Sequence, residues 1–227
     1  MVRAALPITC LLSLALACSC ESKSGPAEQD RAGRIAALAS DGPSDGGAKL
    51  VEALSDPDPS VRKAAVFALT SCLTEENRPA IVKATRDSDR EVRAGAVTTL
   101  SMYKDKDAAK RLGEVLAGDA EPQVQMFSAS GLGMNPAPEA VVALLENAEK
   151  HPSPNIRKMA MKQLVAKLGL RIWREMDPTS RDWAGLVEHM KNQKLVQDSY
   201  LACGATLQHR PQDVMTDSPE HGAARGS

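Results

Sequence analysis

The residue types that most often carry chemistry are few and scattered in this sequence. The four histidines show neither HExxH spacing nor a cysteine or second histidine at metal-ligand spacing; they are His151, His189, His209 and His221. The phosphate-binding pattern GxxxxGK[ST] and the dinucleotide-binding pattern GxGxxG are both missing. We therefore expect solvated histidines, no catalytic residue, no bound metal and no cofactor.

Two of the five cysteines, Cys72 and Cys203, lie in the part of the chain that we expect to fold. A disulfide requires Cα atoms within about 7 Å of each other. Stacked helices are spaced by about 8–10 Å, and several helices are predicted between these two residues. We expect both cysteines to be free thiols that pack in the interior.

A cluster of cations without any acid covers residues 157–174. It could bind an anionic partner, a lipid headgroup or a glycan, or it could be a solvated helix face with apolar stems along the surface. The formal net charge of the whole chain is -1, which gives no overall attraction to nucleic acid. The cluster contains Arg157, Lys158, Lys162, Lys167, Arg171 and Arg174, together with Trp173.

The first residues have the pattern of an export signal. Arg3 precedes an apolar stretch from Ala4 to Ala17, which is shorter than the roughly 20 residues that span a membrane as a helix. The end of this stretch resembles a bacterial lipobox, and this resemblance implies lipidation at Cys18. Lipidation at Cys20 and ordinary cleavage after Ala17 are the alternatives. We predict a signal peptide over residues 1–17, a flexible tether over residues 18–28, and a fold that works at the membrane or in the periplasm.

A repeat of about 31 residues organises the rest of the chain. The segments that begin at residues 58, 89, 121 and 153 align, and each has a Val or Ile followed eight residues later by Leu. Each aligned segment predicts a helix, with Asp58, Asp89 and Ser153 as N-caps and proline at the first helical position in three of the four. An apolar helix precedes each one, so the unit is a helical hairpin. The aligned positions are Val61, Val92, Val124 and Ile156, and then Leu69, Leu100, Leu132 and Leu164.

We expect an all-α fold, an α/α superhelix of about four to five helical hairpins over residues 29–207, with clear repeats at 44–169. Aromatic residues make up 3% of the chain, which favours closely packed helices over strands. The helix of the fourth aligned segment is expected to continue past residue 170, and two more helices are predicted near residues 183–190 and 195–207. Residues 208–227 have the composition of a disordered tail.

The pattern D-P-x-V-R-x-x-A-x-x-A-L, nearly complete at residues 58–69, resembles the HEAT repeat in the short form of phycobilisome-lyase-type proteins. The resemblance implies a charge ladder between repeats, which Gln125 would interrupt. It would be formed by Asp58, Asp89 and Glu121 with Arg62, Arg93 and Arg157. The resemblance also implies that the second helices line a concave face. The candidate partner-binding residues on that face are Lys63, Phe67, Thr98, Met126, Lys158 and Lys162.

These features predict a monomeric, non-catalytic scaffold that binds a protein partner at the bacterial cell envelope and binds no nucleic acid. The alternative function is binding of anionic lipid or glycan through residues 157–174. A lyase-like enzyme is less well supported, because no histidine or acidic cluster lies on the expected face.

Overall fold

The computed structural model describes residues 30–31, 33–35, 37, 47–170, 177–179 and 182–208. Within these residues the regular structure is helical, and no strand is present. A 3-10 turn over Leu69–Ser71 directly follows the helix Pro59–Ala68. The helices are α2 (Ala48–Ala53), α3 (Pro59–Ala68), α4 (Arg78–Ala84), α5 (Arg90–Leu100), α6 (Lys106–Gly118), α7 (Pro122–Met134), α8 (Pro138–Lys150), α9 (Pro154–Lys167), α10 (Asp182–Lys191) and α11 (Lys194–Ala202).

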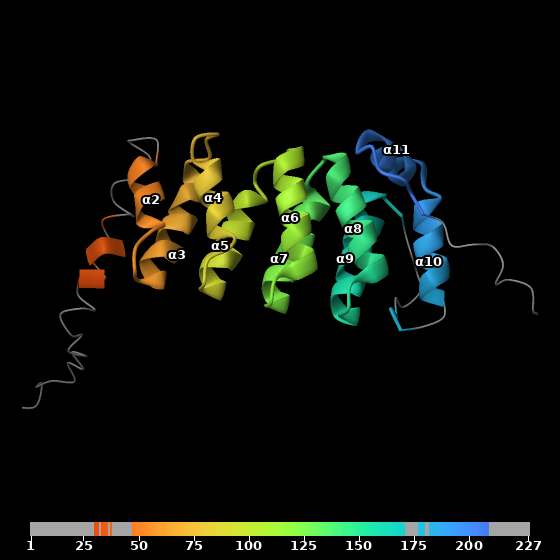
Figure 1. Cartoon of the computed structure of the whole chain (residues 1–227), viewed down its shortest axis with the longest axis horizontal. Coiled ribbons are helices and arrows are strands. Elements are labelled where there is room, and N and C mark those ends of the chain that lie inside the picture. The colour runs from red at the N-terminus through yellow and green to blue at the C-terminus, as the bar shows by residue number, and fades with distance from the viewer. Residues whose placement is uncertain are drawn as a thin grey trace, which may run out of the picture.

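The helices form hairpins that stack side by side in a row (Figure 1). The pairs are α2 with α3, α4 with α5, α6 with α7, and α8 with α9. The second helices of the pairs pack on one another along the row, α3 on α5, α5 on α7 and α7 on α9. Both α10 and α11 pack on α8 at the end of the row. The fold is the α/α solenoid that the repeat predicts.

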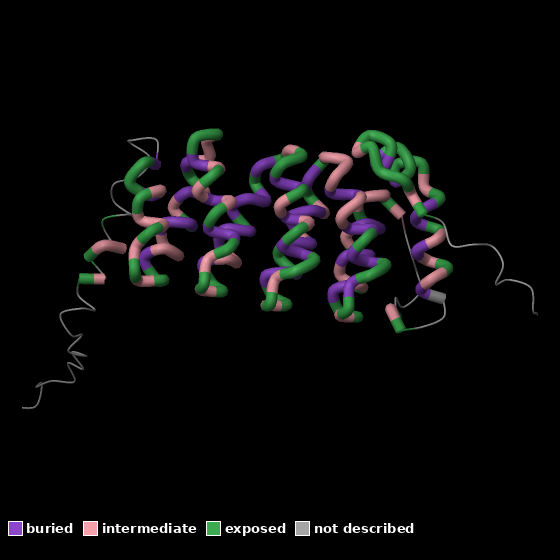
Figure 2. The backbone as a smooth tube through the Cα atoms, viewed as in Figure 1, coloured by how far each residue is buried: buried purple, intermediate pink, exposed green. Residues whose placement is uncertain are grey.

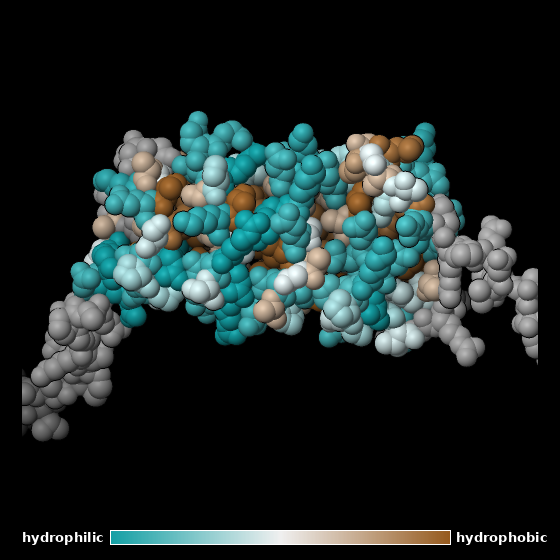
Figure 3. Space-filling model, in the orientation of Figure 1, coloured by the Kyte–Doolittle hydropathy of each residue, from teal (hydrophilic) through white to brown (hydrophobic). Residues whose placement is uncertain are grey.

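The interior is continuous along the row because each repeat contributes the same positions to it. The four aligned Val or Ile side chains are at most 1% exposed, and the four aligned leucines are 0% exposed. One cluster of buried side chains runs from Leu50 to Tyr200, and a second, smaller cluster in the first two repeats contains Val66, Ala84, Val92 and Ala96. Figure 2 shows buried segments on the sides of helices that face one another, and in the view of Figure 3 the outer surface is mostly hydrophilic. A single hairpin could not bury these faces, so the stack folds as a unit.

Aspartates begin three of the helices, and two of them, Asp58 and Asp89, are the caps that the sequence predicts. Asp58 accepts the N–H of Ser60, Asp89 accepts those of Glu91 and Val92, and Asp105 begins α6 in the same way. These bonds satisfy amides that have no partner within the helix. Ser153 stands at the N-cap of α9, but its side chain accepts no hydrogen bond there, so its predicted capping role is wrong.

The charge ladder exists, but its acids are not the predicted ones. Arg62 makes two hydrogen bonds to Asp87, at 2.8 and 2.7 Å, and Arg93 makes two to Asp119, at 2.9 and 3.1 Å. These acids lie two residues before the N-cap, in the turn between the two helices of a hairpin, where the arginine of the preceding repeat reaches them. The acids Asp58, Asp89 and Glu121 stand at helix N-caps instead.

Gln125 interrupts the ladder, as predicted. Its amide donates to the Asp119 carbonyl within its own repeat and makes no bond to the fourth repeat among the described residues. Arg157 also departs from the predicted ladder, because it donates to the carbonyl oxygens of His151 and Pro178 and to no carboxylate.

The helices α9 and α11, at the C-terminal end of the solenoid, are shorter than the sequence predicts. The helix α9 ends at Lys167, where Gly169 adopts a left-handed φ of 66° and the Leu170 N–H bonds back to Val165. The helix α11 ends at Ala202, near Gly204 with φ 65°. The predicted signal peptide, Cys18, the tether and the tail after residue 208 lie outside the described residues. No helix in the described part is long and apolar enough to span a bilayer.

Candidate functional site

Among the described residues, five of the seven exposed large apolar side chains lie on or just after the second helices of the hairpins, and the other two, Leu195 and Leu201, lie on α11. Phe67 on α3, Met126 and Phe127 on α7 and Met134 at the end of α7 are 47, 41, 40 and 62% exposed, and Met102, just after α5, is 48% exposed. We call the exposed side chains of α3, α5, α7 and α9 the second-helix face. Single exposed apolar residues are ordinary, but a group on one face is typical of an interaction surface.

The six predicted binding residues all lie on this face. Thr98, Lys158 and Lys162 are exposed, like Phe67 and Met126. Lys63 is half-exposed and forms an ion pair with Glu91 at 2.5 Å. They are spread over four successive helices at equivalent repeat positions, so they form rows along the solenoid and do not converge on one point.

A hollow of about 260 Å³ lies across α5 on the second-helix face. Its walls include Phe67 from α3 and Phe127 from α7, and the small side chain of Ala94 on α5 lies between them. Lys63, Arg90, Glu91, Glu121, Gln123 and Val124 complete the lining. An apolar hollow with charges of both signs around it suits an amphipathic protein segment better than a uniformly charged ligand.

Phe127, Met102 and Met134 were not predicted from the sequence. The predicted binding residues lie two or six residues after an aligned Val or Ile, whereas Phe127 lies three residues after Val124. Two aligned counterparts of Phe127 are the small residues Ala64 and Gly95. The signal available in the sequence was a large aromatic residue at a repeat position where two other repeats have small residues.

One comparison with known proteins, a match to a family model, agrees with the helical repeat. Residues 47–120, which include α2 to α6, match the family model described as HEAT repeats. This stretch of the chain is therefore similar to HEAT repeats. A solved structure, the complex of CpcE and CpcF of phycocyanin lyase from Nostoc sp. PCC7120, matches with a TM-score of 0.43 and 20% identity, over 75% of this chain and 99% of that chain. A comparison with curated proteins found no match.

Two of the cations in the basic segment, residues 157–174, are less available for binding a ligand than the composition indicates. Arg157 binds backbone carbonyls, and Lys167 donates to the Asn135 carbonyl at the end of α7. Burial, and then the charge of Lys104, lower the pKa of Lys167. Lys158 and Lys162 remain exposed on α9, whereas Arg171, Trp173 and Arg174 lie outside the described residues.

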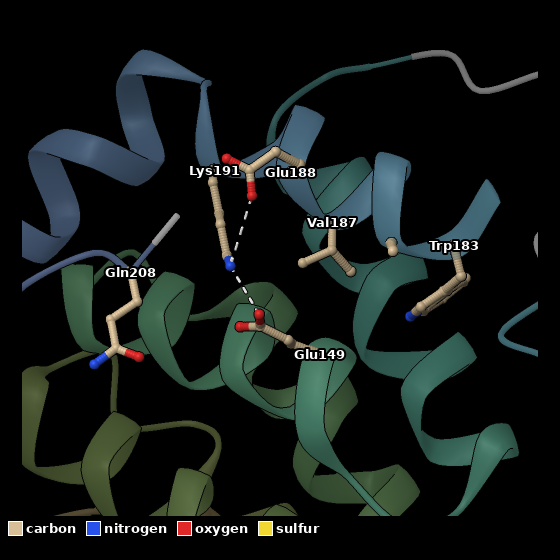
Figure 4. Close-up of a pocket in the computed structure, with 7 residues that line it drawn as sticks. Glu149, Trp183, Val187, Glu188, Lys191 and Gln208 are labelled. Atoms are coloured by element: carbon tan, nitrogen blue, oxygen red, sulfur yellow. Dashed lines mark hydrogen bonds and ion pairs between the residues drawn. The ribbon is translucent and has the colours of Figure 1, made fainter. Parts of the chain in front are cut away.

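A second hollow, of about 360 Å³, lies where α10 meets α8 beyond the HEAT repeats (Figure 4). The Lys191 side chain is 5% exposed, and its ammonium lies 2.7 Å from Glu149 and 3.8 Å from Glu188. Trp183 on α10 donates its indole N–H to the Ala148 carbonyl at 3.0 Å. These contacts fix α10 against the last turn of α8, so we interpret this cluster as an anchor for the end of the solenoid.

Replacing Lys191 by methionine tests the anchor. We expect the variant to lose about 1.5–3 kcal/mol of stability, because Glu149 would lose a charged hydrogen bond. Hydrogen exchange should show the loss as faster exchange in α10 and α11, with α3 and α5 unchanged. Lys150→Met, at an exposed neighbouring lysine, is the matched control. Equal effects of the two substitutions would contradict the anchor.

The structure corrects one histidine and one cysteine: Cys203 is only partly buried and does not pack in the interior as expected. His151 is 6% exposed and not solvated, because the turn that carries it is packed between helices. His189 is exposed, and His209 and His221 lie outside the described residues. Cys72 and Cys203 are free thiols, and Cys72 is buried beside Asn77. The described residues contain no cluster of histidine, cysteine and acidic side chains that could hold a metal.

Proposed function

We propose that the chain is a non-catalytic scaffold that binds another protein through the second-helix face. The observation that carries the proposal is the hollow between Phe67 and Phe127, with exposed Met126 on the same helix as Phe127. Burying these side chains against a partner would remove apolar area from water, worth about 25 cal/mol per Å². Methionine side chains are flexible and suit an adaptable contact surface.

We also propose that this binding takes place at the bacterial cell envelope. The support is the export-like pattern of residues 1–17 and the lipobox-like residues before Cys18. This part of the proposal has its own test, which does not involve the binding face. Cys18→Ala should release the protein from the membrane fraction, and globomycin should block its processing. Unchanged fractionation of Cys18→Ala would contradict lipidation at this residue.

The binding test is a crosslinking pull-down from intact cell envelopes. The variant Lys63→Glu/Phe67→Asp places two acids in the hollow and should reduce the yield of crosslinked partner at least about tenfold, the effect of losing about 1.4 kcal/mol of binding free energy. Phe127→Asp, on the opposite wall of the hollow, should also reduce the yield of crosslinked partner. Circular dichroism melting should first show that each variant is folded.

The matched control makes the same kinds of substitution on a first helix. Lys110 and Ala117 are both exposed on α6, so Lys110→Glu/Ala117→Asp changes charge and polarity equally but leaves the second-helix face intact. We expect wild-type yields from this control. The same partners at the same yield from Lys63→Glu/Phe67→Asp would show that the second-helix face is not the binding surface.

The alternative, binding of anionic lipid or glycan, depends on the two exposed lysines of α9. It predicts salt-sensitive binding to anionic vesicles that is lost in Lys158→Glu/Lys162→Glu and retained in Phe67→Asp. The scaffold proposal predicts protein binding that is lost in Phe67→Asp. It has the stronger support, because Arg157 and Lys167 are engaged in backbone hydrogen bonds.

A further inference from the structure

The joint between the third and fourth repeats is built differently from the two joints before it. In the earlier joints an arginine pairs with an aspartate of the next repeat, Arg62 with Asp87 and Arg93 with Asp119. Gln125 follows Arg93 by 32 residues, and His151 follows Asp119 by 32 residues. Both members of the ion pair are therefore exchanged for other residues at the third joint.

His151 retains one of the two roles of the aspartate. Asp87 and Asp119 each accept the backbone N–H two residues further on, at 2.9 Å. The Nδ1 atom of His151 accepts the corresponding N–H of Ser153 at 3.1 Å. Its other ring nitrogen, Nε2, is buried and has no hydrogen-bond partner in the described part of the chain. This arrangement requires the neutral ring, because a protonated histidine has no acceptor nitrogen.

The surroundings of His151 oppose a positive charge on it. Arg157 on α9 donates to the His151 carbonyl at 2.8 Å, and its charge acts on the ring. Gln125, which is neutral, occupies the position on α7 that an arginine occupies on α3 and α5. Arg157 also donates to the Pro178 carbonyl in the segment 177–179. This segment carries one acid, Asp177, whose carboxylate accepts the backbone N–H and the hydroxyl of Thr179.

We propose that the third joint contains an acid-sensitive turn: protonation of His151 breaks its bond to Ser153 and loosens the start of α9, on the fourth-repeat side of the joint. The joints closed by Arg62–Asp87 and Arg93–Asp119 hold under the same conditions.

The direction of the pH dependence follows from the folded and unfolded pKa values. Burial, and then the charge of Arg157, lower the pKa of His151 below its ordinary value of 6.5. The unfolded chain therefore binds more protons than the folded one between the two values. The contribution of this joint to stability is complete above 6.5 and is lost as the pH falls through the folded pKa.

The decisive experiment compares hydrogen exchange in the wild type and in His151→Asn. Asparagine is the matched substitution because Asn135 already accepts the N–H two residues further on, from Ala137 at 2.9 Å, and it does not titrate. Comparison of the two proteins at the same pH cancels intrinsic exchange rates. From about pH 7.5 to about pH 5.5, the wild-type opening constant of α9 should rise up to about tenfold more than that of His151→Asn, as expected for one linked proton.

The double variant Gln125→Arg/His151→Asp rebuilds the earlier kind of joint and supplies a second arm. It should show no acid-dependent loosening of α9 in this pH range, because the rebuilt aspartate remains ionised there. Equal pH dependence of the wild type and His151→Asn would overturn the proposal. Equal loosening of α3 and α5 in the wild type would also overturn it, because the effect would then not belong to the third joint.

Discussion

Replacing Asp87 by alanine is expected to lower the free energy of unfolding by about 3 kcal/mol. The Asp87 and Arg62 side chains are 13% and 12% exposed, so the substitution leaves a largely buried guanidinium without its carboxylate. It also removes the acceptor for the Asp89 N–H. Urea unfolding followed by circular dichroism measures the loss.

Two substitutions separate the ladder from ordinary surface charge effects. Lys63→Ala removes an exposed pair with Glu91 and should cost less than about 1 kcal/mol. Asp87→Asn keeps an acceptor for the Asp89 N–H and removes only the charge, so its cost should lie between the other two. If Asp87→Ala cost no more than Lys63→Ala, the ladder would not stabilise the stack.

The ladder should also weaken in strong acid. Burial by itself raises the pKa of Asp87, but hydrogen bonds from Arg62 and from the Asp89 N–H outweigh it, so the pKa is lowered below 3.8. The stability from this group is present above the unfolded pKa and is lost as the pH falls through the folded one. The difference between the wild type and Asp87→Asn should therefore shrink well below the range in which His151 titrates.

Replacing Gly131 by valine is expected to destabilise the solenoid by about 3 kcal/mol or more. A Cβ atom at this position would lie 2.7 Å from the Ser101 Cβ and 3.2 Å from the Leu112 Cδ1. Both neighbours are buried, so the helices would have to separate. Gly131→Ala should also be destabilising, because the same clash exceeds the roughly 1 kcal/mol that alanine gains over glycine in a helix.

Gly118, the last residue of α6, provides the control. A Cβ atom there would meet nothing within 4 Å, so Gly118→Ala should be neutral or slightly stabilising. Differential scanning calorimetry of the three variants would show the opposite signs directly. An unchanged melting temperature for Gly131→Val would contradict the close approach of these helices.

The repeat could be predicted from the sequence because its signals are local. Helical spacing of the apolar residues and the aspartate caps at Asp58 and Asp89 depend on neighbours within one or two turns. The exposed Phe67 and Met126 could be placed on the outer side of their helices by the same reasoning. The end of α9 was mispredicted, because Gly169 closes a helix whose apolar pattern continues.

Three features could not be predicted from the sequence, because they depend on how the repeats stack. The partner of Arg62 is Asp87, not the expected cap residue, because the reach between adjacent turns and not the motif decides the pairing. His151 is buried although it lies in a turn, a position where the sequence predicts a solvated side chain. Phe127 meets the hollow opposite Phe67 because α3 and α7 both pack against α5.

The sequence by itself determined that this chain forms helical hairpins stacked into a solenoid, because hydrophobic period and helix capping are set within each 31-residue unit. The tertiary structure decided which charges pair, which histidine is buried and which exposed residues share a surface. Those properties depend on atoms from different repeats, and their distances are fixed when the hairpins pack against one another.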